Sequence, residues 1–332
     1  MTNRQQSTSG EDALIARYFR PLATDPGALG LVDDAAILQT SGDEIVVTTD
    51  AIVEGVHFLP DDPADTVARK ALRVNLSDLA AKGAAPAGFV LTLALRAQDD
   101  AWLAPFARAL GEDAGLFDCP LLGGDTVSTP GPVMISITAF GRVSAGKMVR
   151  RSGARPGDRI VVTGTIGDAA LGLDILKRGA AAGLGEDAAA REMLVGRYRV
   201  PQPRNAMAEA IRDHASAAMD VSDGLAGDLA KLCAASGVSA VIDSKSIPLS
   251  GAAMTWMARG AVDIEGIVSG GDDYEILCAI PEASFESFAQ AAGRAGVAVA
   301  SIGTVIAGAS APRFLDAQGR EIALRRMSYS HF

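Results

Sequence analysis

The sequence predicts an α+β protein built from two domains. Segments with the patterns of strands and of helices mix along its 332 residues without the strict alternation of a doubly wound sheet. A chain of this length exceeds one typical compact domain and can bury two hydrophobic cores. Its 48% hydrophobic residues and 36 glycines, with only 5% aromatic residues, favour small-residue packing and many turns over disorder. We expect the domains to cover 1–152 and 153–332, with the boundary near Ser152.

Local patterns define the elements expected in the first domain. A β-branched run at 44–50 predicts a buried strand that ends on Asp50. Asp62 and Pro63 suit the N-cap and the first position of a helix, and 132–143 alternates as a strand does. The expected helices are 11–19, 62–82 and 101–114, and the expected strands are 44–50, 88–95 and 132–143.

The second domain is expected to open with a strand at 158–164 and a glycine-rich turn at 165–168. Such a turn is more often a tight connection than a phosphate site. A strand should end at Asp220 or Val221, ahead of a helix for which Ser222 is a plausible N-cap. The other expected elements are helices at 168–178, 193–198, 205–214 and 225–236, a loop at 180–190, strands at 240–243, 274–280 and 301–305, and a hairpin near 317–319.

Isolated aspartates in apolar surroundings are the main functional signal. A short apolar strand within 119–125 is expected to end on Asp125, behind Gly123 and Gly124, which would let backbone N–H groups approach a phosphate closely. Two carboxylates about 4 Å apart repel by roughly 4 kcal/mol at an effective dielectric constant near 20, so several can converge only around cations. We interpret the aspartates as one cation-binding cleft formed by Asp33, Asp34, Asp50, Asp78, Asp125, Asp220 and Asp223.

Asp78 is placed by the periodicity of its expected helix. On a helical wheel it falls with Val67 and Val74, away from the polar sector that holds Lys70 and Arg73. A carboxylate on an apolar sector needs a compensating partner. A metal ion or a hydrogen bond to a neighbouring loop would each satisfy it, and the surrounding aspartates favour the metal.

Charge, cysteines and hydropathy exclude several classes of function. A net charge of −10 argues against binding to nucleic acid or to acidic membrane surfaces. Cys119, Cys233 and Cys278 show no CxxC spacing, so free cytosolic thiols are expected. No apolar stretch is long enough to span a bilayer, and the polar start does not resemble an export signal. We therefore expect a cytoplasmic protein with no membrane partner.

Two familiar catalytic motifs are absent. The segment 141–148 nearly matches the phosphate loop GxxxxGK[ST], but Met148 lacks the hydroxyl that would hold magnesium. No GxSxG occurs, and His57, His214 and His331 lie beside no obvious nucleophile. A P-loop enzyme and a serine or cysteine hydrolase are therefore disfavoured.

The motifs taken together resemble the thiamine-monophosphate kinase family, within the superfamily of aminoimidazole ribonucleotide synthetase and selenophosphate synthetase. The resemblance runs through nearly the whole chain, and the His57 loop, the segment 270–275 and the terminal His331-Phe332 resemble the thiamine-phosphate branch in particular. The matching motifs are Gly10 to Phe19, Asp33-Asp34, Thr48-Thr49-Asp50, Glu54 to Phe58, Asn75 to Asp78, Gly123-Gly124-Asp125, Arg151 to Gly153, Asp220 to Gly224, Gly270 to Glu275 and His331-Phe332.

This resemblance implies ATP-dependent phosphorylation of thiamine monophosphate to thiamine diphosphate, with ATP as co-substrate and several Mg²⁺ ions per site. It also implies a two-domain aminoimidazole ribonucleotide synthetase-like fold. In that fold the N-terminal domains of a homodimer share a β-barrel, and the C-terminal domain is an α/β sandwich. The implied metal ligands are Asp34, Thr48, Thr49, Asp50, Asp78, Asp125, Asp220 and Asp223; the implied ATP contacts are Gly124, Asp125, Arg151 and Ser222; and the implied substrate contacts are His57, Asp272 and Tyr329.

The sequence departs from the family pattern at two positions. Val32 replaces a usual glycine, and Asp272 replaces a frequent glutamate, which shortens a substrate-facing carboxylate by one methylene. Because the acceptor phosphate has a second pKa of about 6, we expect direct in-line transfer without a covalent nucleophile or a catalytic base. Two alternatives stay open: a sister ATP-dependent synthetase that uses another acceptor, and a Mg-nucleotide sensor without turnover.

Overall fold

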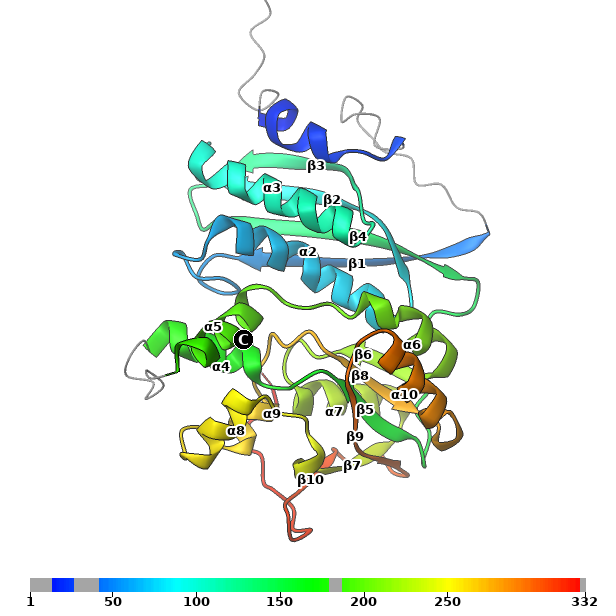
Figure 1. Ribbon diagram of the computed structural model, residues 1–332. Helices are drawn as coiled ribbons and strands as arrows, with labels where there is room; N and C mark the ends of the chain where they lie inside the picture. Colours follow the sequence, from blue (N-terminus) through cyan, green and yellow to red (C-terminus); the bar gives the residue numbers. More distant parts are fainter. Residues whose placement is uncertain (1–13, 27–41, 179–186, 329–332) are drawn as a thin grey trace, which may run out of the picture. The chain divides into compact units, whose positions relative to one another are not determined.

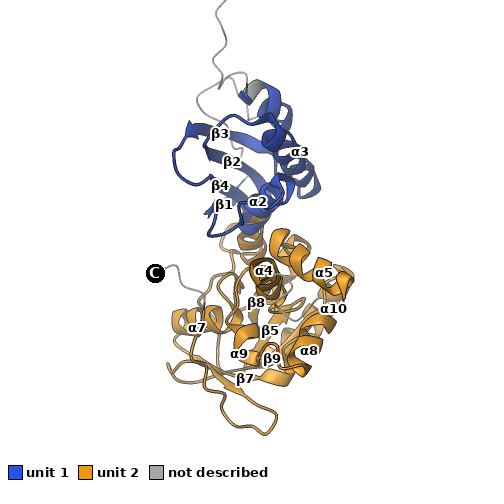
Figure 2. Ribbon diagram, turned by 90° about the vertical axis from the view of Figure 1, so that its left-hand side faces the viewer, with its two compact units in different colours: residues 1–75, 86–142 blue, residues 76–85, 143–332 orange. Residues whose placement is uncertain are grey.

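The computed structural model describes residues 14–26, 42–178 and 187–328. The chain forms two compact units (Figure 2): unit 1 comprises Met1–Asn75 and Pro86–Arg142, and unit 2 comprises Leu76–Ala85 and Val143–Phe332. The division lies at Arg142 and Val143, ahead of the boundary expected near Ser152. The reason is that Val149 is buried in the core of unit 2 together with Ala80 and Ala81.

Unit 1 contains a four-stranded sheet with α2 and α3 against one of its faces (Figures 1 and 2). The strand order is β1-β4-β2-β3, and β2 and β3 are parallel. The elements are helical turns at Ile15–Phe19 and Arg20–Leu22, strands β1 (Asp43–Val53), β2 (Ala85–Leu95), β3 (Leu121–Ser128) and β4 (Met134–Ser144), and helices α2 (Ala64–Ala81) and α3 (Asp100–Leu116).

Two strands continue past the aspartates on which they were expected to end. β1 runs on to Val53 and β3 to Ser128, so Asp50 and Asp125 lie inside strands. The prediction of strand ends at these residues was therefore wrong. The β-branched residues that follow each aspartate sustain the strand, and an aspartate on an exposed sheet position does not break the ladder of hydrogen bonds.

The basic sector of α2 is buried rather than solvated. Lys70 and Arg73 are 2% and 5% exposed. Lys70 Nζ donates to the His57 carbonyl at 2.8 Å, and Arg73 Nε and Nη2 donate to the Asp113 carboxylate at 2.5 and 2.9 Å. Because Asp113 belongs to α3 and is fully buried, this pair fixes α2 to α3. The wheel separated this sector from Asp78, but the basic sector is the buried one, whereas Asp78 is only half-buried.

Unit 2 contains a six-stranded mixed sheet in the order β10-β7-β9-β5-β8-β6. Every pairing is antiparallel except that of β10 with β7. The strands are β5 (Arg159–Thr163), β6 (Ala217–Asp220), β7 (Ser239–Asp243), β8 (Ile276–Ile280), β9 (Val299–Ile306) and β10 (Arg313–Leu315). The helices are α4 (Asp168–Arg178), α5 (Ala188–Arg199), α6 (Ala208–His214), α7 (Leu225–Ser236), α8 (Gly251–Ala258), α9 (Ile264–Val268) and α10 (Phe285–Arg294).

Helices cover both faces of this second sheet. Ile160 and Val162 of β5 pack into one core cluster with residues of α4, α7, α8 and α9, whereas Val161 packs into another with residues of α6 and α10. Successive residues of a strand face opposite sides, so the sheet is the middle layer of an α/β sandwich. The predicted α+β class with two domains is confirmed. Within the described ranges, no helix has the length and apolar character needed to cross a membrane.

Candidate active site

The predicted site residues fall into two groups, each described within its own unit. Unit 1 carries Thr48, Thr49, Asp50, His57, Gly124 and Asp125, and unit 2 carries Asp78, Arg151, Asp220, Ser222, Asp223 and Asp272. Asp34 and Tyr329 lie outside the described residues. In the part of the chain that the structure describes, no three carboxylate, histidine or cysteine side chains converge as a metal site. The single cleft therefore stays a prediction.

The three adjacent candidates on β1 do not share one face of the sheet. Side chains alternate along a strand, so Thr48 and Asp50 project to one face and Thr49 to the other. Thr49 Oγ1 accepts from Thr138 Oγ1 at 2.9 Å and donates to the Ile137 carbonyl at 3.2 Å. The hydroxyl of Thr49 is thus held by β4, while Thr48 and Asp50 form a pair of oxygen donors on the same face.

Asp50 and Asp125 lie on different strands that are not neighbours. β4 and β2 separate β1 from β3, and three strand spacings of about 4.8 Å put the two backbones about 14 Å apart. Magnesium holds its oxygen ligands at about 2.1 Å. One ion therefore cannot bind both carboxylates within one unit.

Gly124 is required by the packing of β3 on β2. A Cβ added to Gly124 would lie 1.9 Å from the Leu91 carbonyl oxygen, and these two residues are paired in the sheet. Any side chain at this position would push the two strands apart. The sequence indicated a glycine that admits a close approach, and the structure shows that the approaching group is the neighbouring strand.

The last residue of β1 holds the ring of His57. Its Nδ1 accepts from the Val53 amide at 3.0 Å, which places the proton of the neutral imidazole on Nε2. Its carbonyl accepts from Lys70, as described above. The side chain of His57 is half-buried.

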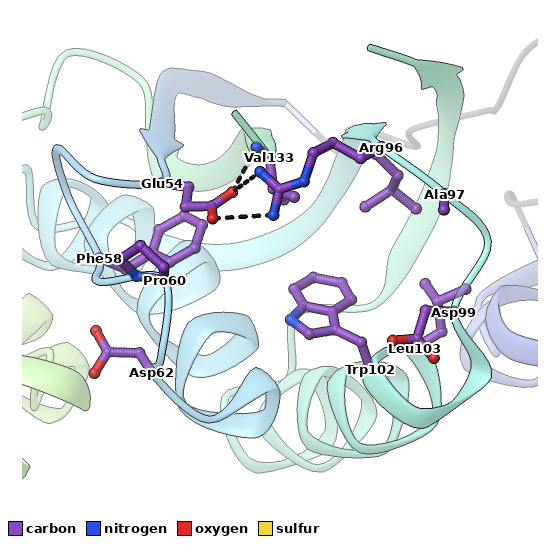
Figure 3. A pocket seen from close by; sticks show the side chains of 11 residues that line it. Glu54, Phe58, Pro60, Asp62, Arg96, Ala97, Asp99, Trp102, Leu103 and Val133 are labelled. Carbon is purple, nitrogen blue, oxygen red and sulfur yellow. Dashed lines mark hydrogen bonds and ion pairs between the residues drawn. The ribbon is translucent and has the colours of Figure 1, made fainter. Parts of the chain in front are cut away.

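A pocket of about 210 Å³ lies next to this loop (Figure 3) and was not foreseen from the sequence. Phe58 and Trp102 supply its aromatic lining. Glu54 on its rim forms an ion pair with Arg96 at 2.5 and 3.0 Å and accepts from the Val133 amide at 3.0 Å. The hydrogen bond from Arg96 lowers the pKa of Glu54 below its ordinary 4.5. Three acidic residues line the pocket, Glu54, Asp62 and Asp99, and Glu54 is already paired with Arg96.

In unit 2, Asp78, Asp220 and Arg151 lie around a lysine that sequence reasoning missed. Lys82, just beyond the end of α2, donates from Nζ to the Ala218 carbonyl at 2.8 Å. Burial lowers the pKa of Lys82, the charges of Asp220 and Asp78 raise it, and Arg151 opposes them. This part of the predicted site is therefore one electrostatic cluster. No sequence pattern marks Lys82, because its contact with the Ala218 carbonyl joins residues 136 positions apart.

The turn before α7 is paired with the loop that carries Asp272. Asp272 N donates to the Ser222 carbonyl and Tyr274 N to the Val221 carbonyl, each at 2.8 Å. Asp272 and Tyr274 have φ angles of 71° and 50°, a strained region for non-glycine residues that often marks functional sites. A Cβ on Gly271 would lie 2.6 Å from the Ser222 carbonyl oxygen. The motifs at 220–224 and 270–275 thus form one structure.

Two further residues around this turn were also missed. Asp228, fully buried in the first turn of α7, accepts from the amides of Ser222 and Asp223, each at 3.0 Å. Lys231 donates to Asp223 and Asp228 at 2.5 and 2.8 Å. Burial raises the pKa of Asp228, and the hydrogen bond from Lys231 opposes that rise. A possible sequence signal was an acidic residue shortly after a Ser-Asp-Gly turn, which is typical of a helix N-terminus.

Buried acids next to Asp272 have structural partners. Glu275 is fully buried and accepts from Thr163, Arg197 and Arg204, with four bonds of 2.5 to 2.6 Å. Asp273 accepts from the Gly167 amide at 2.7 Å, at the glycine-rich turn before α4. That amide is therefore occupied by the chain itself, in agreement with a tight connection. Burial raises the pKa of Asp273 well above its ordinary value.

Comparison with known proteins shows the same two-part organisation. The chain matches the AIR synthase related protein, N-terminal domain, over residues 32–143, and the AIR synthase related protein, C-terminal domain, over 155–313. It is 45% identical to a thiamine-monophosphate kinase of Caulobacter vibrioides over 323 residues, which cover 96% of this chain and 89% of that protein.

Solved structures extend this result. The crystal structure of thiamine-monophosphate kinase from Stenotrophomonas maltophilia K279a is 36% identical with a TM-score of 0.82, covering 94% of this chain and 96% of that one. A structure of AaThiL complexed with AMPPCP and TMP is 29% identical with a TM-score of 0.76, covering 90% and 91%. With both domain matches and an identity of 45% along nearly its whole length, the chain belongs to the thiamine-monophosphate kinases of the AIR synthase related family.

Proposed function

We propose that this protein transfers the γ-phosphoryl group of ATP to thiamine monophosphate and forms thiamine diphosphate. The observation that carries the proposal is the alignment of nearly the whole chain with thiamine-monophosphate kinases, including AaThiL, whose structure contains AMPPCP and TMP. The paired motifs at 220–224 and 270–275 support it, because they bring a predicted nucleotide residue, Ser222, next to a predicted substrate residue, Asp272.

The donor groups in both units suit magnesium. Carboxylate and hydroxyl oxygens are the ligands that Mg²⁺ prefers, and bound Mg²⁺ would neutralise the negative charge of the phosphates. Because Asp50 and Asp125 are too far apart for one ion, several ions per site fit the arrangement better than one. The residues proposed to hold metal are Asp34, Thr48, Asp50, Asp78, Asp125, Asp220 and Asp223; those proposed to contact ATP are Gly124, Asp125, Arg151 and Ser222; and those proposed to contact thiamine monophosphate are His57, Asp272 and Tyr329. Thr49 is left out of the metal ligands, because its hydroxyl is bonded to β4 on the opposite face of the sheet.

The transfer is direct and in line. The acceptor phosphate is largely dianionic near neutral pH, because its second pKa is about 6, so no side chain has to remove a proton. The chain's own contribution is to align the two phosphates, and Arg151 would add a positive charge near them. Incubation with γ-labelled ATP alone should leave no label on the protein. Transfer from a chiral γ-phosphate should invert configuration, and retention would disprove the direct route.

A homodimer through unit 1 is part of the proposal. Helices α2 and α3 cover one face of the sheet, and no described helix covers the other (Figure 2). Val47 on β1 and Val127 on β3 are 57% and 45% exposed, which is unusual for valines in strands. A barrel shared with a second copy would bury such a face. Val47→Asp with Val127→Asp should convert a dimer into a monomer in light scattering, and a monomeric wild type would contradict the assembly.

One assay tests the function and separates its alternatives. The full chain is incubated with ATP and millimolar MgCl₂, with and without thiamine monophosphate, and both ADP and thiamine diphosphate are measured. We expect both products only when the acceptor is present. Folded protein that releases ADP without thiamine diphosphate would indicate a sister synthetase, and binding of ATP without any ADP would indicate a sensor.

A further inference from the structure

The turn at 221–224, between β6 and α7, is held from two sides. On one side it pairs with the backbone of the loop that carries Asp272, as described above. On the other, the buried carboxylate of Asp228 accepts from the amides of Ser222 and Asp223. These bonds fix the backbone of the turn, but they leave the side chain of Asp223 to be oriented by something else.

Lys231 supplies that orientation. Its Nζ donates to Oδ2 of Asp223 at 2.5 Å and to Oδ1 of Asp228 at 2.8 Å. Asp228 and Lys231 lie three residues apart on α7, a spacing at which helical side chains are neighbours. From the residues that the structure describes, Oδ1 of Asp223 accepts no hydrogen bond. The lysine thus holds one oxygen of Asp223, whose side chain is 37% exposed.

We propose that Lys231 is a positioning residue for Asp223, which it holds ready for the magnesium–nucleotide complex. This inference rests on the proposed function, in which Asp223 is a metal ligand and Ser222 contacts ATP. Two carboxylates this close would repel each other without a cation between them. Lys231 therefore keeps Asp223 beside Asp228 before a metal ion binds. Binding then costs little conformational entropy, because the Asp223 side chain is already ordered.

A purely structural role for Lys231 would have a different consequence. If the lysine only neutralised the buried Asp228, its loss would lower the stability of unit 2 and leave nucleotide affinity unchanged. If it positions Asp223, affinity for the magnesium–nucleotide complex must fall in protein that is still folded. Binding affinity and thermal stability therefore have to be measured on the same variants.

The experiment is an equilibrium titration of the full chain with AMPPCP and MgCl₂, which needs no turnover. Lys231→Met should weaken binding by about 10-fold or more, the effect usual for residues that orient metal ligands. Lys231→Arg should stay within about 3-fold of wild type, because a guanidinium can donate to both carboxylates. Lys177→Met, an exposed lysine on α4 of the same unit, is the matched control and should bind as wild type does.

A second variant keeps the test decisive. In Asp228→Asn the amide oxygen can still accept from the two backbone amides, but the side chain no longer attracts Lys231. The affinity of this variant for Mg–AMPPCP should therefore fall as that of Lys231→Met does. Since both variants break one arrangement, the double variant should lose little more than either single one. Fully additive losses, unchanged affinity in Lys231→Met, or a lower melting temperature as the sole effect would each overturn the inference. If wild type itself fails to bind Mg–AMPPCP, the proposed function fails first.

Discussion

The two units present their predicted functional carboxylates in different ways. In unit 1, Asp50 and Asp125 stand inside strands, where the ladder of backbone hydrogen bonds sets their positions. In unit 2, Asp223 and Asp272 stand on loops, and buried residues next to them hold these loops in place. Asp228 anchors the first loop, and Glu275 anchors the second.

The difference shows where a site of this kind needs supporting residues. A strand holds each of its residues in place through its backbone ladder, so the position of a carboxylate there is set by the backbone. A loop has no such ladder. The position of a carboxylate on a loop therefore depends on the buried groups that hold the loop backbone in place. Substitutions of supporting acids should therefore affect folding in unit 2, whereas substitutions of the strand-borne acids should affect chemistry alone.

The largest effect is expected from Glu275→Gln. This carboxylate is fully buried and receives both Arg197 and Arg204, so removal of its charge leaves two partly buried guanidinium groups without their partner. Breaking a buried ion pair costs about 3–5 kcal/mol, and urea denaturation should show a loss of that size. Glu282→Gln, which breaks the exposed pair with Arg159, is the control and should change stability little. Equal losses in the two variants would contradict the supporting role.

Asp50→Asn should leave the fold intact and disable the reaction. The side chain is exposed on β1, so the melting temperature should stay at the wild-type value. The ratio kcat/KM should fall about 100-fold or more, as is usual when a group that stabilises transferring charge is lost. Glu44→Gln, at another exposed position of β1, should keep full activity. Full activity in Asp50→Asn, or unfolding of it, would show that strand-borne acids are not used as proposed.

Asp272→Asn tests the strained loop with a side chain that tolerates its positive φ. We expect KM for thiamine monophosphate to rise about 10-fold, equivalent to about 1.4 kcal/mol of binding. The KM for ATP should hardly change. Asp118→Asn, at an exposed position of unit 1 with a φ of 50°, controls for the effect of the substitution itself. A selective rise in KM for ATP would instead move Asp272 to the nucleotide side.

The smallest effect concerns the acid stability of unit 1. The hydrogen bond from Arg96 lowers the pKa of Glu54, so the ionised form is favoured by folding. The resulting stability is fully present above the ordinary pKa of 4.5 and is lost as the pH falls through the lower pKa of the folded state. Melting temperatures of wild type and Glu54→Gln should therefore differ at pH 7, and the difference should shrink steadily as the pH is lowered below 4.5. A difference that does not change with pH would assign the effect to packing.

The sequence by itself determined the class of the fold, most of its elements and the family. The β-branched run of β1, the spacing of α2 and the aspartate motifs are local patterns, and local propensity and periodicity act over a few residues. Strand lengths were less certain from sequence, because whether a ladder continues past Asp50 depends on the neighbouring strand. The boundary between the units likewise lies ahead of the one expected near Ser152. The reason is that Val149 packs against residues of unit 2 that are far away in sequence.

Only the tertiary structure decided which charged groups meet. Arg73 and Asp113 are 40 residues apart, and Thr163 and Glu275 are 112 apart, so no local pattern could pair them. Lys82 and Lys231 likewise gained their places beside the predicted aspartates through the packing of unit 2. The free energy of a buried ionised group depends on the groups that pair with it, and the fold of the chain determines which groups those are.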